Sequence, residues 1–367
     1  MKSEKLLFLE SLRGIAALSV AFYHFKIGSH FNNSFTDNAW LMVDFFFVLS
    51  GFVIALNYIG RISSVANLVA FQKKRFLRLY PLHFIMLMAF IGLEILKLIL
   101  QEFAGVTINY PPFSDPNNWL AIIANLFLIQ NWVLADLTFN YPSWSISAEF
   151  ITYALFGSLL LITQSSKRAT VTSLIILTLI FGVLLSSFGM GADNISGPLR
   201  CLYSFSIGAL VFFVFSKIRG GLVLSSSLLS AVFLSITVWI IMIQGEKDSD
   251  FVVLLPFLFG ALILVMSVTD KNTLLIRSLS TKWLVFLGTI SYGIYMIHVF
   301  VFSFIAIAFN RFLGVEFTTH ADGEVSLVLD NVFLADLVHV IGIGIIVACA
   351  YVSYRWIELR FTKPKSK

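Results

Sequence analysis

Long apolar runs dominate the chain, and most of them are long enough to cross a lipid bilayer. A membrane-spanning helix needs about 20 consecutive, mostly apolar residues. Ten runs come close to or exceed this length: 7–27, 40–59, 79–101, 144–164, 171–190, 199–216, 222–243, 250–268, 283–309 and 331–356. The pattern predicts an all-α fold, a polytopic integral membrane helical bundle of about ten transmembrane helices.

A further apolar run, 118–134, is shorter and contains Asn118, Asn125, Gln130 and Asn131. If it spanned the membrane, it would reverse the side on which all later loops lie. Polar, irregular backbone is tolerated at membrane depth only where protein covers it. We therefore expect an interfacial or re-entrant segment packed against the bundle, with a full span as the alternative.

Lysine and arginine concentrate in the loops on one side of the predicted bundle. With the amino terminus taken as cytoplasmic, these loops contain Arg61, Lys73, Lys74, Arg75, Arg78, Lys167, Arg168, Lys217, Arg219, Lys271, Arg277 and Lys282. The opposite loops are mainly acidic and contain Asp37, Glu102, Asp115, Asp193, Asp250 and Glu316. Cytoplasmic loops carry an excess of basic residues. We therefore expect both termini in the cytoplasm and one membrane domain over 1–367, with no appended soluble domain.

The composition agrees with a membrane protein and excludes several other classes. Hydrophobic residues make up 58% of the chain and charged residues only 12%, about half the usual soluble fraction. The net charge of +5 resides in short loops, so it does not indicate a nucleic-acid partner. Cys201 and Cys349 lie in apolar runs without metal-ligand spacing, so we expect neither a disulfide nor a metal site. Glu10 and Arg13 interrupt the first run, which argues against a cleavable signal peptide.

Arg13 and His24 share the first predicted span and are eleven residues apart. Eleven steps of about 100° make roughly three turns, which places both side chains on one face, about 16 Å apart along the axis. Ionisable residues inside a membrane helix are expensive and usually functional. One interpretation is that both side chains snorkel to the headgroups. The other is that Arg13 binds an anion and His24 acts as a general base.

Two carboxylates are expected at about the depth of His24. Asp44 opens the second span, and Glu149 opens the fourth after Trp144 and the hydroxyl of Ser147. Either carboxylate can serve the end of its own helix. Alternatively, one orients the histidine or binds an acceptor hydroxyl, while the indole stacks on a sugar ring. Trp144 and Ser147 are therefore candidate substrate-binding residues.

The segment 71–81 is strongly basic and contains Lys73, Lys74, Arg75 and Arg78. The two arginines lie one above the other if this loop is helical. The segment either determines topology alone or docks a phosphate-rich cytosolic ligand, because guanidinium groups bind phosphate through two hydrogen bonds.

A polar, aromatic stripe runs along the predicted span 283–309. Ser291, Tyr295 and His298 recur at three- and four-residue spacing on one face, and Tyr292 lies beside them. An imidazole in mid-membrane requires a partner, so we count Tyr292 and His298 as candidate substrate-binding residues.

Three shorter features complete the pattern. Ser50 and Gly51 in the second span predict close helix packing, because small residues let backbones approach. Glu358 closes the last span, where we expect it to pair with a basic residue. No internal repeat is visible, which argues against the inverted-repeat transporter folds.

Taken together, these segments resemble the acyltransferase-3 family of bacterial membrane O-acyltransferases, which modify surface polysaccharides. Six segments carry the resemblance: Leu12-Arg13-Gly14 with His24, Phe45 to Gly51, Arg75 and Arg78 before Tyr80-Pro81, Trp144 to Glu149, Gly288 to Tyr292 with His298, and Ile357-Glu358. The chain departs from the family pattern at Phe150 and Arg360, where a second acid and a proline are common.

The resemblance implies an enzyme of the bacterial cytoplasmic membrane that uses acetyl-CoA as acyl donor and no metal. The acceptor would be a hydroxyl of a cell-envelope or exported carbohydrate. Arg13 and His24 are then the essential pair, Glu149 is the matching carboxylate, and Arg75 and Arg78 contact the nucleotide end of the donor.

Several points stay open at the level of the sequence. Attack by the acceptor can be direct, or an acyl-enzyme intermediate can carry the group. Transfer would be completed by the membrane domain alone, or with a periplasmic partner or a homo-oligomer. The rival function is a transporter or flippase for a lipid-linked sugar, which would use the same intramembrane charges as a substrate path.

Overall fold

The structure is a computed structural model that describes residues 6–104, 111–164, 166–243, 250–319, 325–327 and 329–362. Its main helices are α1 (Leu7–Tyr23), α3 (Met42–Tyr58), α4 (Val65–Ala104), α7 (Ser143–Ile162), α8 (Lys167–Phe188), α9 (Ser196–Ile218), α10 (Leu228–Ile243), α11 (Leu255–Val268), α14 (Ser291–Leu313) and α15 (Val332–Ser353). Shorter helices are α2 (Ser34–Asp37), α5 (Trp119–Leu126), α6 (Gln130–Val133), α12 (Leu274–Leu279), α13 (Lys282–Thr289) and α16 (Leu359–Thr362). Short 3-10 turns cover Ala39–Leu41 and Asp250–Leu254, and a π-helical turn covers Tyr354–Glu358.

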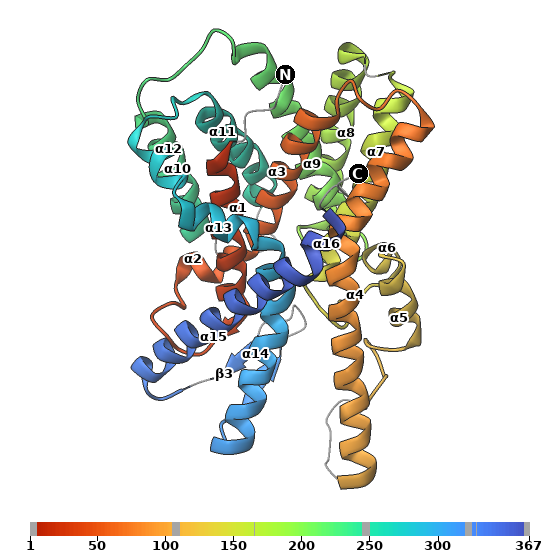
Figure 1. The fold of residues 1–367 in the computed structure, drawn as a ribbon, viewed down its shortest axis with the longest axis vertical. Coiled ribbons are helices and arrows are strands. Elements are labelled where there is room, and N and C mark those ends of the chain that lie inside the picture. Colours follow the sequence, from red (N-terminus) through yellow and green to blue (C-terminus); the bar gives the residue numbers. More distant parts are fainter. Residues whose placement is uncertain are drawn as a thin grey trace.

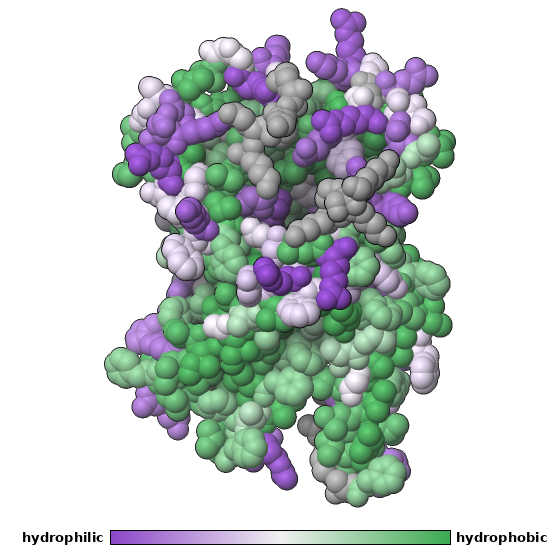
Figure 2. All heavy atoms as spheres, viewed as in Figure 1, coloured by the Kyte–Doolittle hydropathy of each residue, from purple (hydrophilic) through white to green (hydrophobic). Residues whose placement is uncertain are grey.

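The predicted all-α membrane bundle is confirmed. Among the described residues, eight helices are long and apolar enough to cross a membrane. Two other predicted spans correspond to α1, with 17 residues, and α10, with 16, which are shorter. Hydrophobic side chains cover much of the lower half of the face in Figure 2, whereas hydrophilic ones gather towards its upper end.

We expected the basic segment 71–81 to be a loop. In the structure it is part of a helix. α4 runs without interruption for 40 residues and includes Pro81. Figure 1 shows it as the long helix that extends through most of the height of the molecule. Its first turns carry the basic residues, so the helix continues beyond the apolar run that predicted a span over 79–101. Apolar length locates the part of a helix within the bilayer, not where the helix starts.

The predicted span 283–309 is divided into two helices. α13 ends at Thr289 and α14 begins at Ser291, with Ile290 between them. A Cβ atom on Gly288 would lie 1.9 Å from the Glu10 carbonyl oxygen, so α13 packs directly on the backbone of α1. This close crossing of α13 and α1, rather than the composition, sets where the span is broken.

The helices α3 and α9 pack backbone against backbone in the core. A Cβ atom on Gly51 would lie 2.0 Å from the Phe205 carbonyl oxygen, and one on Gly208 would lie 1.9 Å from the Val48 carbonyl oxygen. The predicted close packing at Gly51 is therefore confirmed. Small residues on both helices allow the two backbones to touch.

The segment 118–134 forms no single helix of spanning length. α5 and α6 are short, and their polar side chains are buried against the bundle: Asn125 donates to the Thr138 hydroxyl at 2.8 Å, and Gln130 donates to the Ser143 carbonyl at 3.2 Å. The preferred prediction of a segment packed on the bundle agrees with this arrangement. The asparagine and glutamine residues satisfy buried backbone, which a lipid-exposed segment would leave unpaired.

A small three-stranded sheet follows the first helix. β1 (Phe25–Lys26) pairs in parallel with β3 (Val325–Leu327), which pairs antiparallel with β2 (Phe317–Thr319). The amide of Val325 donates to the His24 carbonyl at 2.9 Å, so the sheet holds the backbone of the candidate base.

Three loops that we predicted on one side of the membrane do meet at one end of the bundle. Arg61, Arg219 and Lys271 come from separate loops and line a single cavity. The agreement supports the predicted order of spans. The termini, residues 1–5 and 363–367, lie outside the described residues, so their cytoplasmic location stays a prediction.

Candidate active site

A cavity of about 160 Å³, here called the inner cavity, brings together residues from five helices. Five of the candidate residues line it: Arg13 of α1, Arg75 and Arg78 of α4, Glu149 of α7 and Tyr292 of α14. These side chains come from positions up to 279 residues apart in the sequence. The inner cavity therefore contains three guanidinium groups opposite one carboxylate.

Arg13 reaches the inner cavity from the middle of α1. Its Nη1 atom donates to Glu10 Oε2 at 2.9 Å, an i, i+3 contact on the same helix. The side chain is about a quarter exposed. Gly14 lies beside it, where a Cβ atom would be 2.6 Å from the Gly288 amide nitrogen. The tight crossing of α1 and α13 thus fixes the position from which Arg13 extends.

Arg78 is already paired within the chain. Its Nη1 atom donates to Glu358 Oε2 at 2.8 Å, and the Glu358 side chain is 1% exposed. The guanidinium also lies 5.8 Å from the centre of the Tyr292 ring, whose hydroxyl donates to the Leu79 carbonyl. The predicted pairing of Glu358 is confirmed. Glu358 balances the charge of Arg78, so Arg78 is not an unpaired cation. The ion pair joins the wall of the inner cavity to the π-helical turn that contains Glu358.

Arg75 stands between two cavities. Besides the inner cavity, it lines a second one of about 430 Å³, here called the Tyr58 cavity. Its Nη2 atom donates to the Tyr58 hydroxyl at 3.5 Å, and its guanidinium lies about 6 Å from the rings of Phe71 and Tyr153. No carboxylate pairs with Arg75 among the described residues. The charge of Arg75 is therefore available to an anion.

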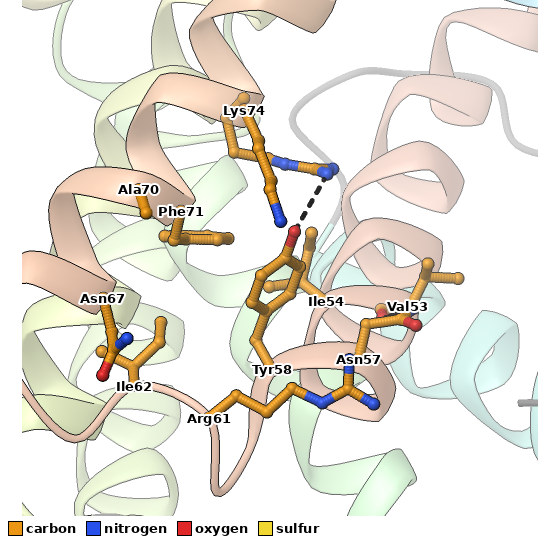
Figure 3. Close-up of a pocket in the computed structure, with 11 residues that line it drawn as sticks. Val53, Ile54, Asn57, Tyr58, Arg61, Ile62, Asn67, Ala70, Phe71 and Lys74 are labelled. Atoms are coloured by element: carbon orange, nitrogen blue, oxygen red, sulfur yellow. Dashed lines mark hydrogen bonds between the residues drawn. The ribbon is translucent and has the colours of Figure 1, made fainter. Parts of the chain in front are cut away.

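The Tyr58 cavity is polar and positively charged. Figure 3 shows Lys74 and Tyr58 pointing toward each other from α4 and α3, with Arg61 and Asn57 below them. The dashed line in Figure 3 is the hydrogen bond from Arg75 to Tyr58. Lys73 is exposed and does not line either cavity.

The candidate base, His24, is paired with a second histidine. It follows α1 directly, is 8% exposed, and its Nδ1 atom lies 3.2 Å from Nε2 of the fully buried His298. His24 Nδ1 also lies 2.9 Å from the Val20 carbonyl oxygen, and His298 Nδ1 lies 3.3 Å from the Ile294 carbonyl oxygen.

These contacts fit one assignment of the ring protons in the neutral pair, in which both Nδ1 atoms are protonated, because a carbonyl oxygen can only accept a hydrogen bond. In this assignment the Nε2 atom of His298 accepts from Nδ1 of His24. The lone pair of His24 is then on Nε2, the atom that would act as a general base.

Tyr295 connects the inner cavity to the histidine pair. It lines the inner cavity, and its ring centre lies 5.9 Å from that of His298. Its hydroxyl is 2.8 Å from the Ser145 hydroxyl and donates to the Pro142 carbonyl at 3.1 Å. One aromatic side chain therefore separates the basic cavity from the two imidazoles. The sequence contained this residue in the polar stripe, but did not indicate that it bridges two parts of a site.

Asp44 has a partner that the sequence analysis missed. Arg200 of α9 donates from Nη2 to Asp44 Oδ2 at 2.6 Å and from Nε to Oδ1 at 3.3 Å, and Ser204 donates to Oδ1 at 3.3 Å. The Asp44 and Arg200 side chains are 0% and 3% exposed. The carboxylate that we expected to support His24 thus neutralises a buried guanidinium. An arginine within an apolar run was the available signal, because an intramembrane charge requires a partner.

Two other candidate side chains also have contacts within the protein. Trp144 and Trp40 lie on Arg200, each with its ring 5.2 Å from the guanidinium carbon. Ser147 is fully buried and donates to the Leu128 carbonyl at 2.9 Å. In this structure the indole packs on the buried arginine, and the serine holds the segment between α5 and α6. Their contact with substrate stays a prediction.

The expected layer of His24, Asp44 and Glu149 is divided into separate clusters. Glu149 lies six residues after the start of α7 at Ser143, about 9 Å farther along the helix axis. It therefore lines the inner cavity with the α4 arginines. Its distance from the helix start places it at the inner cavity and not among the contacts of the histidine pair.

Comparisons with known proteins identify the family of the chain. A family model described as an acyltransferase domain matches residues 6–358. The chain is 31% identical to acyltransferase MdmB of Streptomyces mycarofaciens, over 40% of this chain and 37% of that protein. It is 24% identical to a putative O-acetyltransferase of Staphylococcus aureus (strain COL), over 97% of this chain and 57% of that one.

A third relative is viral: a putative acetyltransferase of Acidianus two-tailed virus is 24% identical, over 79% of this chain and 81% of that protein. No solved structure matches the chain. The family model covers nearly the whole bundle, including the helices that carry Arg13, Arg75, Glu149 and His298. The chain spans 37% of the Streptomyces protein and 57% of the Staphylococcus protein. It belongs to the acyltransferase family that this domain defines, and eight of its described helices are long and apolar enough to cross a membrane.

Proposed function

We propose that this enzyme transfers an acyl group, most simply acetyl, from acyl coenzyme A to a hydroxyl of a cell-envelope or exported carbohydrate, in the cytoplasmic membrane of a bacterium. The observation that carries the proposal is the short distance between two parts of the site. Tyr295 lines a cavity with three arginines, and its ring centre lies 5.9 Å from that of His298 in the buried histidine pair. The first part suits an anionic donor, and the second suits removal of a proton from an alcohol.

The donor enters from the end of the bundle where the basic loops meet. Its phosphates contact Lys74 and Arg75 in the Tyr58 cavity, since both line it and Arg75 has no carboxylate partner among the described residues. Its thioester reaches the inner cavity, where Arg13 provides positive charge for the anion that develops on the carbonyl oxygen. Arg78, with its charge balanced by Glu358, shapes this wall.

The acceptor hydroxyl meets His24. Nε2 of the imidazole takes the hydroxyl proton as the oxygen attacks the thioester carbonyl, the new C–O bond forms, and the C–S bond breaks. The departing thiolate takes this proton from the imidazolium, which returns His24 to its neutral form. His298 accepts the Nδ1 proton of His24 in a hydrogen bond and holds the ring in the basic tautomer. Glu149 lines the inner cavity, where it is available to bind the acceptor.

Release of free coenzyme A by the purified protein tests this function. Acetyl-CoA and envelope glycan are incubated with the wild type, His24→Ala and Arg13→Ala, and the new thiol is measured. Removal of a general base typically reduces the rate 10²- to 10⁴-fold. Two matched controls are His30→Ala, an exposed histidine, and Arg277→Ala, an exposed arginine outside both cavities.

Both variants of the site should lose transfer while the controls keep it. Full activity in membranes that contain normal amounts of either His24→Ala or Arg13→Ala would contradict the assignment. A transporter or flippase would release no coenzyme A at all, in the wild type or in any variant. Mass spectrometry of envelope glycans, with and without the gene, identifies the acceptor.

A further inference from the structure

A third cavity adjoins the two already described. It encloses about 630 Å³ and lies among the loops at the basic end of the bundle, so we call it the loop cavity. Arg61 lines both the loop cavity and the Tyr58 cavity, just as Arg75 lines both the Tyr58 cavity and the inner cavity. The three cavities therefore form a series with one arginine at each junction.

The loop cavity carries an excess of positive charge. Arg61, Arg219 and Lys271 line it, and Asp270 is the one acidic residue among its lining residues. Asp270 Oδ1 accepts a hydrogen bond from the Asn272 amide at 2.7 Å, which satisfies part of its charge. The two guanidinium groups, those of Arg61 and Arg219, favour an anionic ligand beside this partly satisfied carboxylate.

Arg61 is positioned to bind such a ligand. Its guanidinium makes no ion pair or hydrogen bond with the residues that the structure describes, whereas Arg13, Arg78 and Arg200 each pair with a carboxylate. In Figure 3 its side chain extends along the side of the Tyr58 cavity opposite Lys74. A guanidinium at a junction of two cavities can bind a phosphate group from either of them.

The walls of the loop cavity are built by tertiary contacts rather than by a loose loop. The Leu224 amide donates to the Val268 carbonyl, and the Asp270 amide donates to the Leu224 carbonyl, both at 2.9 Å. These bonds tie the segment after α9 to the segment after α11. Apolar side chains of Leu56, Leu222 and Val223 complete the lining. Apolar walls with a few charged groups and a volume of several hundred Å³ suit a nucleoside-sized ligand.

We infer that the loop cavity binds the 3′-phosphorylated adenosine of the acyl-CoA donor, with Arg61 between that nucleotide and the diphosphate. The diphosphate and the pantetheine arm then occupy the Tyr58 cavity, and the thioester reaches the inner cavity past Arg75. This assignment rests on the proposed function. It adds Arg61 and Arg219 to the donor site, neither of which is part of the basic segment of α4. A phosphate of an anionic lipid at the same surface is the other source of this chemistry.

The experiment compares two donors and one fragment. Initial rates are measured with acetyl-CoA and with acetyl-pantetheine, which lacks the nucleotide, and binding of adenosine 3′,5′-bisphosphate is measured by calorimetry. The variants are Arg61→Gln and Arg219→Gln. The matched control is Arg277→Gln, which removes an exposed arginine from α12 that lines none of the three cavities.

We expect each variant to raise the KM for acetyl-CoA and the Kd for the bisphosphate about tenfold, the effect of losing one charge-assisted hydrogen bond. The KM for acetyl-pantetheine should not change, and the control should match the wild type. The split between the two donors separates a lost nucleotide contact from general damage to the fold.

The results distinguish failure of this inference from failure of the proposed function. If the wild type uses acetyl-CoA but neither variant changes the KM or the Kd, the inference is wrong and the proposed function stands. If the wild type neither consumes acetyl-CoA nor binds the bisphosphate, both are wrong. The binding assay is repeated in nanodiscs of neutral and of anionic lipid. If Arg61→Gln reduces retention of anionic lipid but leaves the Kd for the bisphosphate unchanged, the loop cavity binds a lipid headgroup and the inference is wrong.

Discussion

Removing either member of the buried Asp44–Arg200 pair will destabilise the protein more than removing both. The pair joins α3 to α9 through two contacts of 2.6 and 3.3 Å, and both side chains are almost completely buried. The variants are Asp44→Leu, Arg200→Met and the double substitution. Each replaces a charged side chain with an apolar one of similar size.

The magnitude follows from the burial of the charges. A buried charge left without its partner typically costs about 3–5 kcal/mol, whereas exchanging the whole pair for apolar residues is often neutral. In the double variant, the Met190 and Gly191 carbonyls lose the hydrogen bonds that Arg200 Nη1 donates at 2.9 and 3.1 Å. At about 1 kcal/mol each, this loss predicts a cost of about 2 kcal/mol. The coupling between the two positions should therefore be several kcal/mol.

The assay combines thermal unfolding in detergent with specific activity of the folded fraction. Asp37→Leu is the control, because Asp37 pairs with Lys26 at the surface, where an ion pair contributes about 0–1 kcal/mol. The reasoning is refuted if Asp44→Leu is as stable as the wild type, or if the cost of the double variant equals the sum of the single ones. A folded but inactive double variant would instead restore the catalytic role that the sequence suggested for Asp44.

Three further predictions concern other contacts of the site. Gly51→Ala should destabilise the protein by about 1–3 kcal/mol or abolish folding, since its Cβ would meet a backbone oxygen, while Gly92→Ala, with no atom within 4 Å, should be tolerated in the same thermal assay. His298→Ala should lower kcat about 10- to 100-fold with little change in KM, because it removes the group that holds the basic tautomer of its partner. Glu358→Ala should destabilise by about 1.5–3 kcal/mol, the value of a hydrogen bond to a charged group, and weaken the wall that Arg78 forms.

Each of these has a clear contrary result. Equal melting of the two glycine variants would show that α3 can move away from α9 at no cost. A rise in KM with constant kcat in His298→Ala would identify a substrate contact instead of a positioning residue. An unchanged melting temperature in Glu358→Ala would mean that solvent replaces the carboxylate, since the Arg78 side chain is 30% exposed.

The fold was largely predictable because hydropathy is a local property. Runs of apolar residues located the main helices, and the polar side chains of 118–134 correctly indicated a segment packed on the bundle. The errors have a common cause. The start of α4 and the break at Ile290 depend on contacts with other helices, and α13 is separated from α14 where it meets α1. Composition within a segment does not report such contacts.

The sequence identified several residues of the candidate site, but it did not identify the side chains that pair with them. Arg13 and Glu149 were identified as charges within predicted spans and Arg75 as part of a basic segment, and the structure brings all three to one cavity. The partners of His24 and Asp44 were not identified. His298 lies 274 residues from His24, and Arg200 lies 156 residues from Asp44, so no spacing rule relates them.

The sequence by itself determined that this protein is a helical membrane bundle, and it identified the charged and polar residues that the bilayer does not tolerate without a role. These conclusions depend on apolar length and on the free energy of burying a charge, which are properties of short segments. Only the tertiary structure decided which charged side chains are neutralised by a partner and which are available to bind a ligand. Arg200 and Arg78 are balanced by Asp44 and Glu358, whereas Arg75 and Arg61 face cavities. That division arises from helix packing over long separations, because a charge contributes to a site only where no neighbouring helix already satisfies it.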